Sequence, residues 1–440
     1  SSGVPLVLVH DTPSLAESAM ADLVTGAGID DARLLPQRET LPFEFADPHV
    51  EITSQRVDAF SALLAGKTRL LVTTARGLVE RSPVAVRGED FSLFLRQGEK
   101  WSRAQLAERL SRMGFTASDS VQELGDFAVR GGIVDLFPFG SDLPIRVELW
   151  DDEIASIRSF DLLSQRSVER HEDAEVLPVS LDPGQFEEMG VTWERRCLLE
   201  LLPEDSIVVE VGDSGSDARR LRLWKDVRDA WGTDAPGGRR SAADLVLPPV
   251  DVERAFDGLR RVRVGTHDAE PLPGEPSIDL GIRPPPAIDR NMKALVAEIE
   301  EAVRAGEGVL LLCDNQGQLE RLQEILEDLA GGRILREVEL ALGSLSGGMR
   351  IPGPGPLLVL TDHEVFQRSH RVRRGRTLHG VASLESVASL SPGDYVVHMD
   401  HGIGRYDGIE RVTVGDETIE TLKIEYADGG ILRLPHYRID

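Results

Sequence analysis

The strongest constraint on the fold is a glycine-spaced segment near the carboxyl end of the chain. It reads Ser391–Pro–Gly–Asp–Tyr–Val–Val–His–Met–Asp–His–Gly–Ile–Gly–Arg–Tyr–Asp–Gly–Ile409. Gly402, Gly404 and Gly408 recur at close spacing, where a strand must kink or turn. Asp428–Gly429 then separates two strand-like runs, which is a hairpin signal. This segment is therefore predicted to form a small, curved β module, too small for a catalytic cleft and suited to contact with another protein.

The length and composition predict a globular protein of several domains. The 440 residues are 41% hydrophobic and 28% charged, which predicts about three to four domains of ordinary composition. Because there is no long uncharged apolar run and no signal-peptide pattern at the N-terminus, we expect a cytoplasmic protein without a membrane span. Cys197 and Cys313 lie in apolar segments and are expected to be buried thiols, not a disulfide.

The net charge argues against an enzyme that acts on DNA by itself. Lys and Arg number 49 and Asp and Glu 75, so the net charge is 49 − 75 = −26, and an acidic chain repels phosphate backbones. A chain that binds proteins, with DNA handled elsewhere, fits better. One local exception is the basic run that contains Arg371, Arg373, Arg374 and Arg376. It is either a solvated linker or an electrostatic contact with DNA or an acidic domain.

Most of the chain has the pattern of α/β domains. Val4–His10 and Arg69–Thr74 are apolar runs typical of buried parallel strands. Asp11–Thr12–Pro13 is a helix start, with a capping side chain and a proline in the first turn. This alternation of strand and helix predicts a doubly wound sheet.

A β-rich insertion interrupts the first α/β domain. Phe127–Pro138, Leu143–Trp150 and Ile154–Phe160 alternate with period two and are predicted to be three consecutive strands. Ile207–Val211 and Arg261–Gly265 return to α/β, and a second α/β unit follows a Pro-rich boundary. The predicted domains are 1–115 and 186–283 (two halves of one α/β domain), 116–185 (β insertion), 284–370 (further small α/β domain), 371–390 (basic linker) and 391–440 (β module).

No nucleotide site is expected. Gly66–Lys67–Thr68 resembles a fragment of a P-loop, but it follows a helix and precedes a strand, so its amides point the wrong way. In the correct position, after the first strand, His10–Asp11–Thr12 offers no Gly or Lys, and its Asp repels phosphate. Thr361–Asp362–His363–Glu364 mimics a Walker B segment without a P-loop to serve. We therefore expect no ATP, Mg²⁺ or other cofactor in this chain.

Metal binding and catalysis also lack support in the sequence. His398, Asp400 and His401 could supply ligands. His401 lies beyond a turn from the other two, and a hydrogen-bonded turn explains the three residues better. We predict no metal site and no catalytic residues.

The β insertion carries the best candidate for a binding surface. On Leu143–Trp150, Ile145, Val147 and Leu149 are predicted to face the core, and Arg146, Glu148 and Trp150 the other side. An exposed Trp beside an Arg is typical of an interface hot spot, and Arg130 on the preceding strand lies within reach. Alternatively, Trp150 packs under a loop and the arginines pair with Asp151 or Asp152.

The sequence resembles bacterial transcription-repair coupling factors along nearly its whole length. The glycine-spaced segment resembles their RNA-polymerase-interacting domain, which is Tudor-like and is shared with CarD-type regulators. Gly125–Pro138, Leu143–Ile154 and Phe160–Ser167 resemble the second domain of their UvrB homology module. Leu41–Phe45 and Ser54–Arg56 resemble the first. The resemblance implies an α/β multidomain protein: a degenerate P-loop-like UvrB homology module with the β insertion, the further α/β domain and a C-terminal Tudor-like small β-barrel.

The resemblance also implies two partners and their sites. In this family two arginines and an aromatic residue bind UvrA, and they match Arg130, Arg146 and Trp150. The family aromatic is often Phe, so Trp150 is a departure in size. The strand after the glycine turns pairs with the β-subunit of RNA polymerase, and it matches Ile409, Arg411, Val412 and Thr413.

The expected function is recruitment of nucleotide excision repair to stalled RNA polymerase. Family members continue into ATP-dependent motor domains that translocate on double-stranded DNA, whereas this sequence stops before them. We therefore expect a non-catalytic, monomeric chain that contacts DNA mainly through those domains. Two alternatives are a CarD-like transcription regulator without a repair role, and an active UvrB-type helicase. The acidic α/β units argue against the first, and the lack of a P-loop argues against the second.

Overall fold

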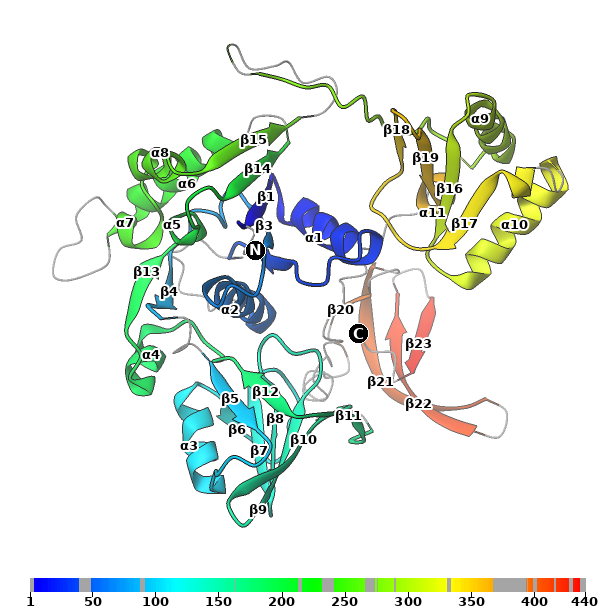
Figure 1. Ribbon diagram of the computed structural model, residues 1–440. Coiled ribbons are helices and arrows are strands. Elements are labelled where there is room, and N and C mark those ends of the chain that lie inside the picture. Colours follow the sequence, from blue (N-terminus) through cyan, green and yellow to red (C-terminus); the bar gives the residue numbers. More distant parts are fainter. Residues whose placement is uncertain are drawn as a thin grey trace. The chain divides into compact units, whose positions relative to one another are not determined.

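The structure is a computed structural model, and Figure 1 shows its parts. The described residues are 4–38, 49–87, 92–162, 164–212, 216–231, 241–265, 274, 276–288, 290–330, 334–366, 393, 395–398, 402–414, 417–426 and 430–435. They form a mixed α/β protein with several separate sheets, as the sequence predicted. Each part is built on a β-sheet of its own.

The first α/β part is built on a parallel sheet in the order β15–β14–β1–β3–β2. Its strands are β1 (Leu6–His10), β2 (Arg33–Leu35), β3 (Leu70–Thr74), β14 (Ile207–Val211) and β15 (Arg260–Val264). Its helices are α1 (Pro13–Ala21), the π-helical turn η1 (Asp22–Gly26), α2 (Val50–Leu64), α5 (Leu198–Leu201), α6 (Ser216–Trp231), α7 (Ala242–Leu245) and α8 (Pro249–Phe256). A separate pair, β4 (Ser82–Ala85) and β13 (Trp193–Arg196), is antiparallel.

The local sequence explains why these elements form. Thr12 is the N-cap of α1, where its hydroxyl accepts a hydrogen bond from the Leu15 amide, and Pro13 begins the helix. All five residues of β3 are buried, as expected of a central parallel strand. Phe60 of α2 and Phe256 of α8 share one buried cluster with the strands. The predicted parallel α/β fold is therefore confirmed.

The β insertion is a six-stranded sheet in the order β11–β10–β9–β8–β7–β6. Its elements are α3 (Arg103–Arg112), β6 (Thr116–Ala117), β7 (Asp126–Arg130), β8 (Ile133–Leu136), β9 (Ile145–Trp150), β10 (Glu153–Phe160) and β11 (Ser167–His171). The prediction that Phe127–Pro138 is one strand was wrong. Gly131 adopts a φ of 59°, and the chain reverses there to pair β7 with β8 as a hairpin.

Short elements connect the insertion to its surroundings in the chain. These are β5 (Leu93–Arg96), β12 (Asp173–Val176) and α4 (Pro183–Met189). Asp182 caps α4, and Gly190 ends it in the left-handed conformation, which is a common way to stop a helix.

The second α/β part has the sheet order β17–β16–β19–β18. Its elements are α9 (Met292–Arg304), β16 (Gly308–Cys313), α10 (Gln316–Ala330), the 3₁₀ turn η3 (Ile334–Arg336), β17 (Val338–Leu342), β18 (Met349–Ile351), β19 (Leu357–Thr361) and α11 (Asp362–Phe366). Strand β16 is parallel to both β17 and β19. Leu295 and Leu322 of the two long helices pack in one core with Leu311 of β16, which confirms the second α/β unit predicted after the Pro-rich boundary.

The described residues of the C-terminal module form an antiparallel sheet in the order β20–β21–β22–β23. The strands are β20 (Tyr395–His398), β21 (Gly402–Val414), β22 (Glu417–Glu425) and β23 (Ile431–Pro435). A register shift between Tyr406 and Gly408 marks a bulge, and Gly408 has a φ of 116°. The curved β module is thus observed, whereas closure into a Tudor-like barrel stays a prediction.

Two smaller expectations concern the cysteines and the helices. Cys197 and Cys313 are buried free thiols, as predicted. Every helix within the described residues is too short or too polar to span a bilayer.

Candidate protein-binding sites

One face of the β insertion gathers the three residues singled out for binding. Arg146, Glu148 and Trp150 alternate along β9 with the buried Ile145 and Val147. Cross-strand partners share a face of a sheet. Arg146 lies opposite Asp135 of β8 and Arg158 of β10. The next row along the sheet contains Arg130, Ile133 and Glu148, so Arg130 lies on the same face.

Trp150 is the most exposed of these side chains. It is 76% exposed at the end of β9, so the alternative in which it packs under a loop was wrong. The turn after it consists of two residues, Asp151 and Asp152, with φ angles of 48° and 60°. Positive φ at both central residues defines the tight turn whose twist matches a hairpin. The turn therefore fixes Trp150 at the tip of the β9–β10 hairpin.

Arg146 is held by the neighbouring strand. Its Nε and Nη2 donate to the two carboxylate oxygens of Asp135 at 2.7 and 2.9 Å, and the guanidinium lies 4.4 Å from the centre of the Phe160 ring. The hydrogen bond with Asp135 raises the pKa of Arg146 above its usual value. The ion-pair partner of Arg146 is thus Asp135, and Arg146 also donates to Gln165 at 3.3 Å. The alternative in which Arg146 pairs with Asp151 or Asp152 was wrong.

Arg130 is less constrained than Arg146. It is exposed, and its Nε donates to the backbone oxygen of Asp119 at 3.2 Å. Among the described residues, no other hydrogen bond holds its guanidinium in place.

The structure adds neighbours that sequence reasoning missed. Glu148 accepts hydrogen bonds from Ser156 at 2.6 Å and from Arg158 at 3.2 Å. Arg158 is 37% exposed on the same face as Arg146. Strand register makes these residues neighbours. Only a correct prediction of how β8, β9 and β10 pair could have revealed them.

The second candidate site is the outer edge of β21. The backbone of Arg411, Val412 and Thr413 pairs with β22 on one side. On the other side, pairing with β20 ends at Arg405. Within the described residues, no strand covers that edge from Tyr406 to Val414. The side chains of Ile409, Arg411, Val412 and Thr413 lie outside the described residues.

The residues considered for nucleotide binding have other partners. Lys67 forms an ion pair with Glu175, and Asp11 forms one with Arg219. A Cβ on Gly212 would collide with the carboxylate of Asp11, so the chain after β14 packs closely against this carboxylate after β1. That environment disfavours phosphate. Arg371–Arg376, Leu41–Phe45, Asp400 and His401 lie outside the described residues.

Comparison with family models assigns two regions of the chain to known classes of interaction domain. Residues 93–181 match the UvrB interaction domain. Residues 390–440 match the CarD-like/TRCF RID domain. The chain is thus a multidomain protein that carries these two interaction domains.

Comparison with curated proteins then identifies relatives that align with nearly the whole length of this chain. The transcription-repair-coupling factor of Staphylococcus aureus (strain USA300) is 23% identical, over 100% of this chain and 43% of the relative. That of Haemophilus influenzae is 24% identical, over 99% of this chain and 42% of the relative. The resemblance to transcription-repair coupling factors is confirmed, and the chain spans less than half the length of these relatives.

Proposed function

We propose that this chain recruits repair proteins to RNA polymerase without catalysing a reaction itself. The β insertion would bind UvrA through Arg130, Arg146 and Trp150. The C-terminal module would bind the β-subunit of RNA polymerase through the outer edge of β21. We further propose that it acts in the cytoplasm, alongside the transcription and repair machinery.

The observation that carries the proposal is the exposure of Trp150 on the same sheet face as a fixed arginine. Trp150 is 76% exposed, although burying a large apolar side chain away from water is favourable. Arg146 is pre-oriented by the two hydrogen bonds that it donates to Asp135, so less conformational entropy is lost when it meets a partner. Tryptophan and arginine are the residues that most often dominate interface energies.

The UvrA half is tested by titrating the whole chain with purified UvrA. We expect Trp150→Ala to weaken binding by about 2 kcal/mol or more, the usual scale of a hot spot. Tyr395→Ala is the matched control, because Tyr395 is an aromatic residue that is 78% exposed in the other module. Equal affinities for wild type and Trp150→Ala would exclude this face as the UvrA site.

The polymerase half is supported by the geometry of β21. An uncovered edge next to a glycine bulge offers backbone donors and acceptors in a row, which is what strand addition requires. Successive residues of an antiparallel strand direct their N–H groups to opposite edges. One of Arg411 and Val412 therefore directs its N–H towards β22, and the other towards the open edge.

This alternation gives a paired proline experiment. Proline removes one N–H donor and is tolerated at an open edge. Of Arg411→Pro and Val412→Pro, we expect one to leave the module folded and to weaken binding of the polymerase β-subunit at least tenfold, and the other to disrupt the β21–β22 pairing. A folded proline variant with unchanged affinity would show that this edge is not the contact.

The comparisons favour this proposal over a CarD-like regulator without a repair role. A CarD-like regulator would account only for the match over residues 390–440. The match over residues 93–181 and the alignment with coupling factors along the whole chain are left unexplained by that alternative. A strain that carries Trp150→Ala distinguishes the two. Under our proposal it is deficient in repair while its binding of RNA polymerase stays normal.

A further inference from the structure

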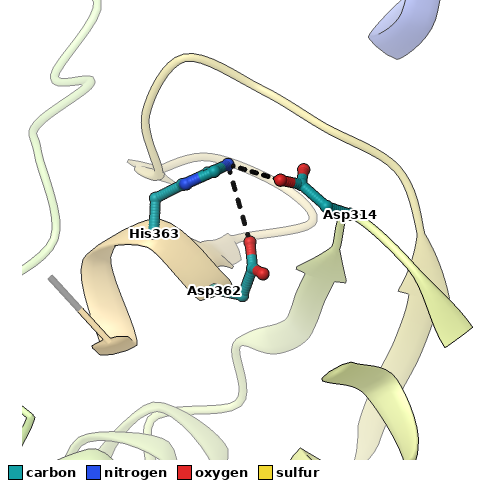
Figure 2. A group of neighbouring side chains, drawn as sticks. All are labelled: Asp314, Asp362 and His363. Atoms are coloured by element: carbon teal, nitrogen blue, oxygen red, sulfur yellow. Dashed lines mark ion pairs between the residues drawn. The ribbon is translucent and has the colours of Figure 1, made fainter. Parts of the chain in front are cut away.

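The second α/β part brings three metal-ligating side chains together at one edge of its sheet. Asp314 directly follows β16, and Asp362 and His363 directly follow β19. The two strands are parallel neighbours, so their carboxyl ends meet at the same edge. In α/β folds this edge is where ligands bind. Figure 2 shows the three side chains converging from the two strand ends.

The distances between the donor atoms are those of a small cluster. Nε2 of His363 lies 3.0 Å from Oδ2 of Asp314 and 3.7 Å from Oδ1 of Asp362. All three donor atoms lie within 4.8 Å of one another. Ligands about 2.0–2.2 Å from a zinc ion are separated from each other by roughly 3–3.5 Å. Small rotations of the side chains therefore suffice to bring all three to one ion.

Burial gives a second, independent reason to expect a ligand. Asp362 is 1% exposed and His363 is 9% exposed. Oδ1 of Asp314 is buried and accepts no hydrogen bond from the residues that the structure describes. A buried carboxylate oxygen without a partner is unfavourable, and such an atom is commonly satisfied by water or an ion.

The charge of the three groups selects a cation. Two carboxylates and one imidazole carry at least one net negative charge between them, even when the imidazole is protonated. A neutral imidazole with two carboxylates is a donor set that suits first-row transition ions, because imidazole favours Zn²⁺ over Mg²⁺ or Ca²⁺. We propose that Asp314, Asp362 and His363 bind a divalent transition-metal ion such as Zn²⁺.

The site goes beyond recruitment of UvrA and polymerase, and it does not depend on either. Three protein ligands leave at least one coordination position for water. The ion would join the ends of β16 and β19 and so stabilise the sheet of this part, since binding to the folded state alone raises its stability.

The test is a zinc titration of the whole chain after treatment with a chelator. We expect calorimetry to show one Zn²⁺ bound per chain, and Asp314→Asn to weaken that binding at least tenfold. Asp314→Asn preserves shape at a partly exposed position, so it should fold. Asp328→Asn, an exposed change on α10, is the matched control and should bind as the wild type does.

Thermal unfolding provides a second readout. Zn²⁺ should raise the Tm of the wild type and of Asp328→Asn, and should leave the Tm of Asp314→Asn and His363→Gln unchanged. Absence of zinc binding by the wild type would overturn the proposal, whatever the variants do. Binding that Asp314→Asn leaves intact would also overturn it, because the zinc would then lie elsewhere.

Discussion

The carboxylate of Asp135 holds the guanidinium of Arg146 through two hydrogen bonds of 2.7 and 2.9 Å. The pair joins β8 to β9 across their shared face. The Asp135 side chain is only 4% exposed, whereas that of Arg146 is 18% exposed. Asp135 therefore fixes the orientation of the Arg146 guanidinium.

Asp135→Asn should weaken UvrA binding although Asp135 is buried. The amide cannot accept both guanidinium hydrogen bonds, so Arg146 loses its fixed orientation. We expect a loss of about 1.5–3 kcal/mol in binding free energy, the range for hydrogen bonds to charged groups. Calorimetric titration of the whole chain with UvrA measures it.

The control is Glu169→Gln, an exposed carboxylate of β11. It removes the same charge from the insertion, and UvrA affinity should be unchanged. If Asp135→Asn and Glu169→Gln reduce affinity equally, net charge rather than the orientation of Arg146 explains the effect.

The β9–β10 turn predicts a stability difference between two substitutions at one position. Asp152 has a φ of 60°, where a β-branched residue is strained and glycine is not. Asp152→Val should lower the free energy of unfolding by about 1–2 kcal/mol, and Asp152→Gly should be tolerated. Denaturant unfolding compares them, and equal stabilities would contradict the turn geometry.

A buried arginine network should be essential to the first α/β part. Arg56 is 2% exposed and donates to Pro36 at 2.6 Å and to Ser82 at 2.7 Å. Burial lowers the pKa of Arg56 to about 10, against the opposing effect of Glu80. Arg56→Ala removes these buried hydrogen bonds and the ion pair with Glu80, which keeps its ion pair with Arg76, so we expect a loss of about 1.5–3 kcal/mol.

Urea unfolding of Arg56→Ala measures that loss. The matched control is Arg254→Ala, since the Arg254 side chain is 74% exposed. Exposed ion pairs contribute about 0–1 kcal/mol, so the control should unfold almost as the wild type does. Similar effects of the two substitutions would mean that the buried network contributes little.

His10 predicts how stability depends on pH. Burial at the end of β1 lowers the pKa of His10, and the nearby charge of Asp11 only partly opposes this. Below about pH 6.5 the unfolded chain therefore binds a proton more readily than the folded chain does, so stability falls as the pH falls. Above that pH both states are neutral and the effect disappears.

His10→Gln should remove this contribution. Comparing unfolding free energies of the variant and the wild type between about pH 5 and pH 8 isolates His10 from the other histidines. The difference between the two proteins should change only in the acidic half of this range. A constant difference would show that the pKa of His10 is not lowered.

The elements of the α/β parts follow from local sequence. The apolar run that became β3 and the Thr12–Pro13 start of α1 are set by burial and capping, which act over a few residues. The alternation that placed Trp150 opposite the core of β9 is equally local. The split of Phe127–Pro138 into β7 and β8 was missed because the period-two pattern continues through the Gly131 turn.

The sequence by itself determined the main strands and helices of the α/β parts, and which side chains of β9 leave the core. Only the tertiary structure decided that Asp135 holds Arg146, and that Asp314 meets Asp362 and His363. The physical reason is that hydrophobic periodicity records burial within one element, whereas such contacts depend on strand order and register. A carboxylate becomes a positioning group or a metal ligand only when a neighbouring strand brings its partner within about 3 Å.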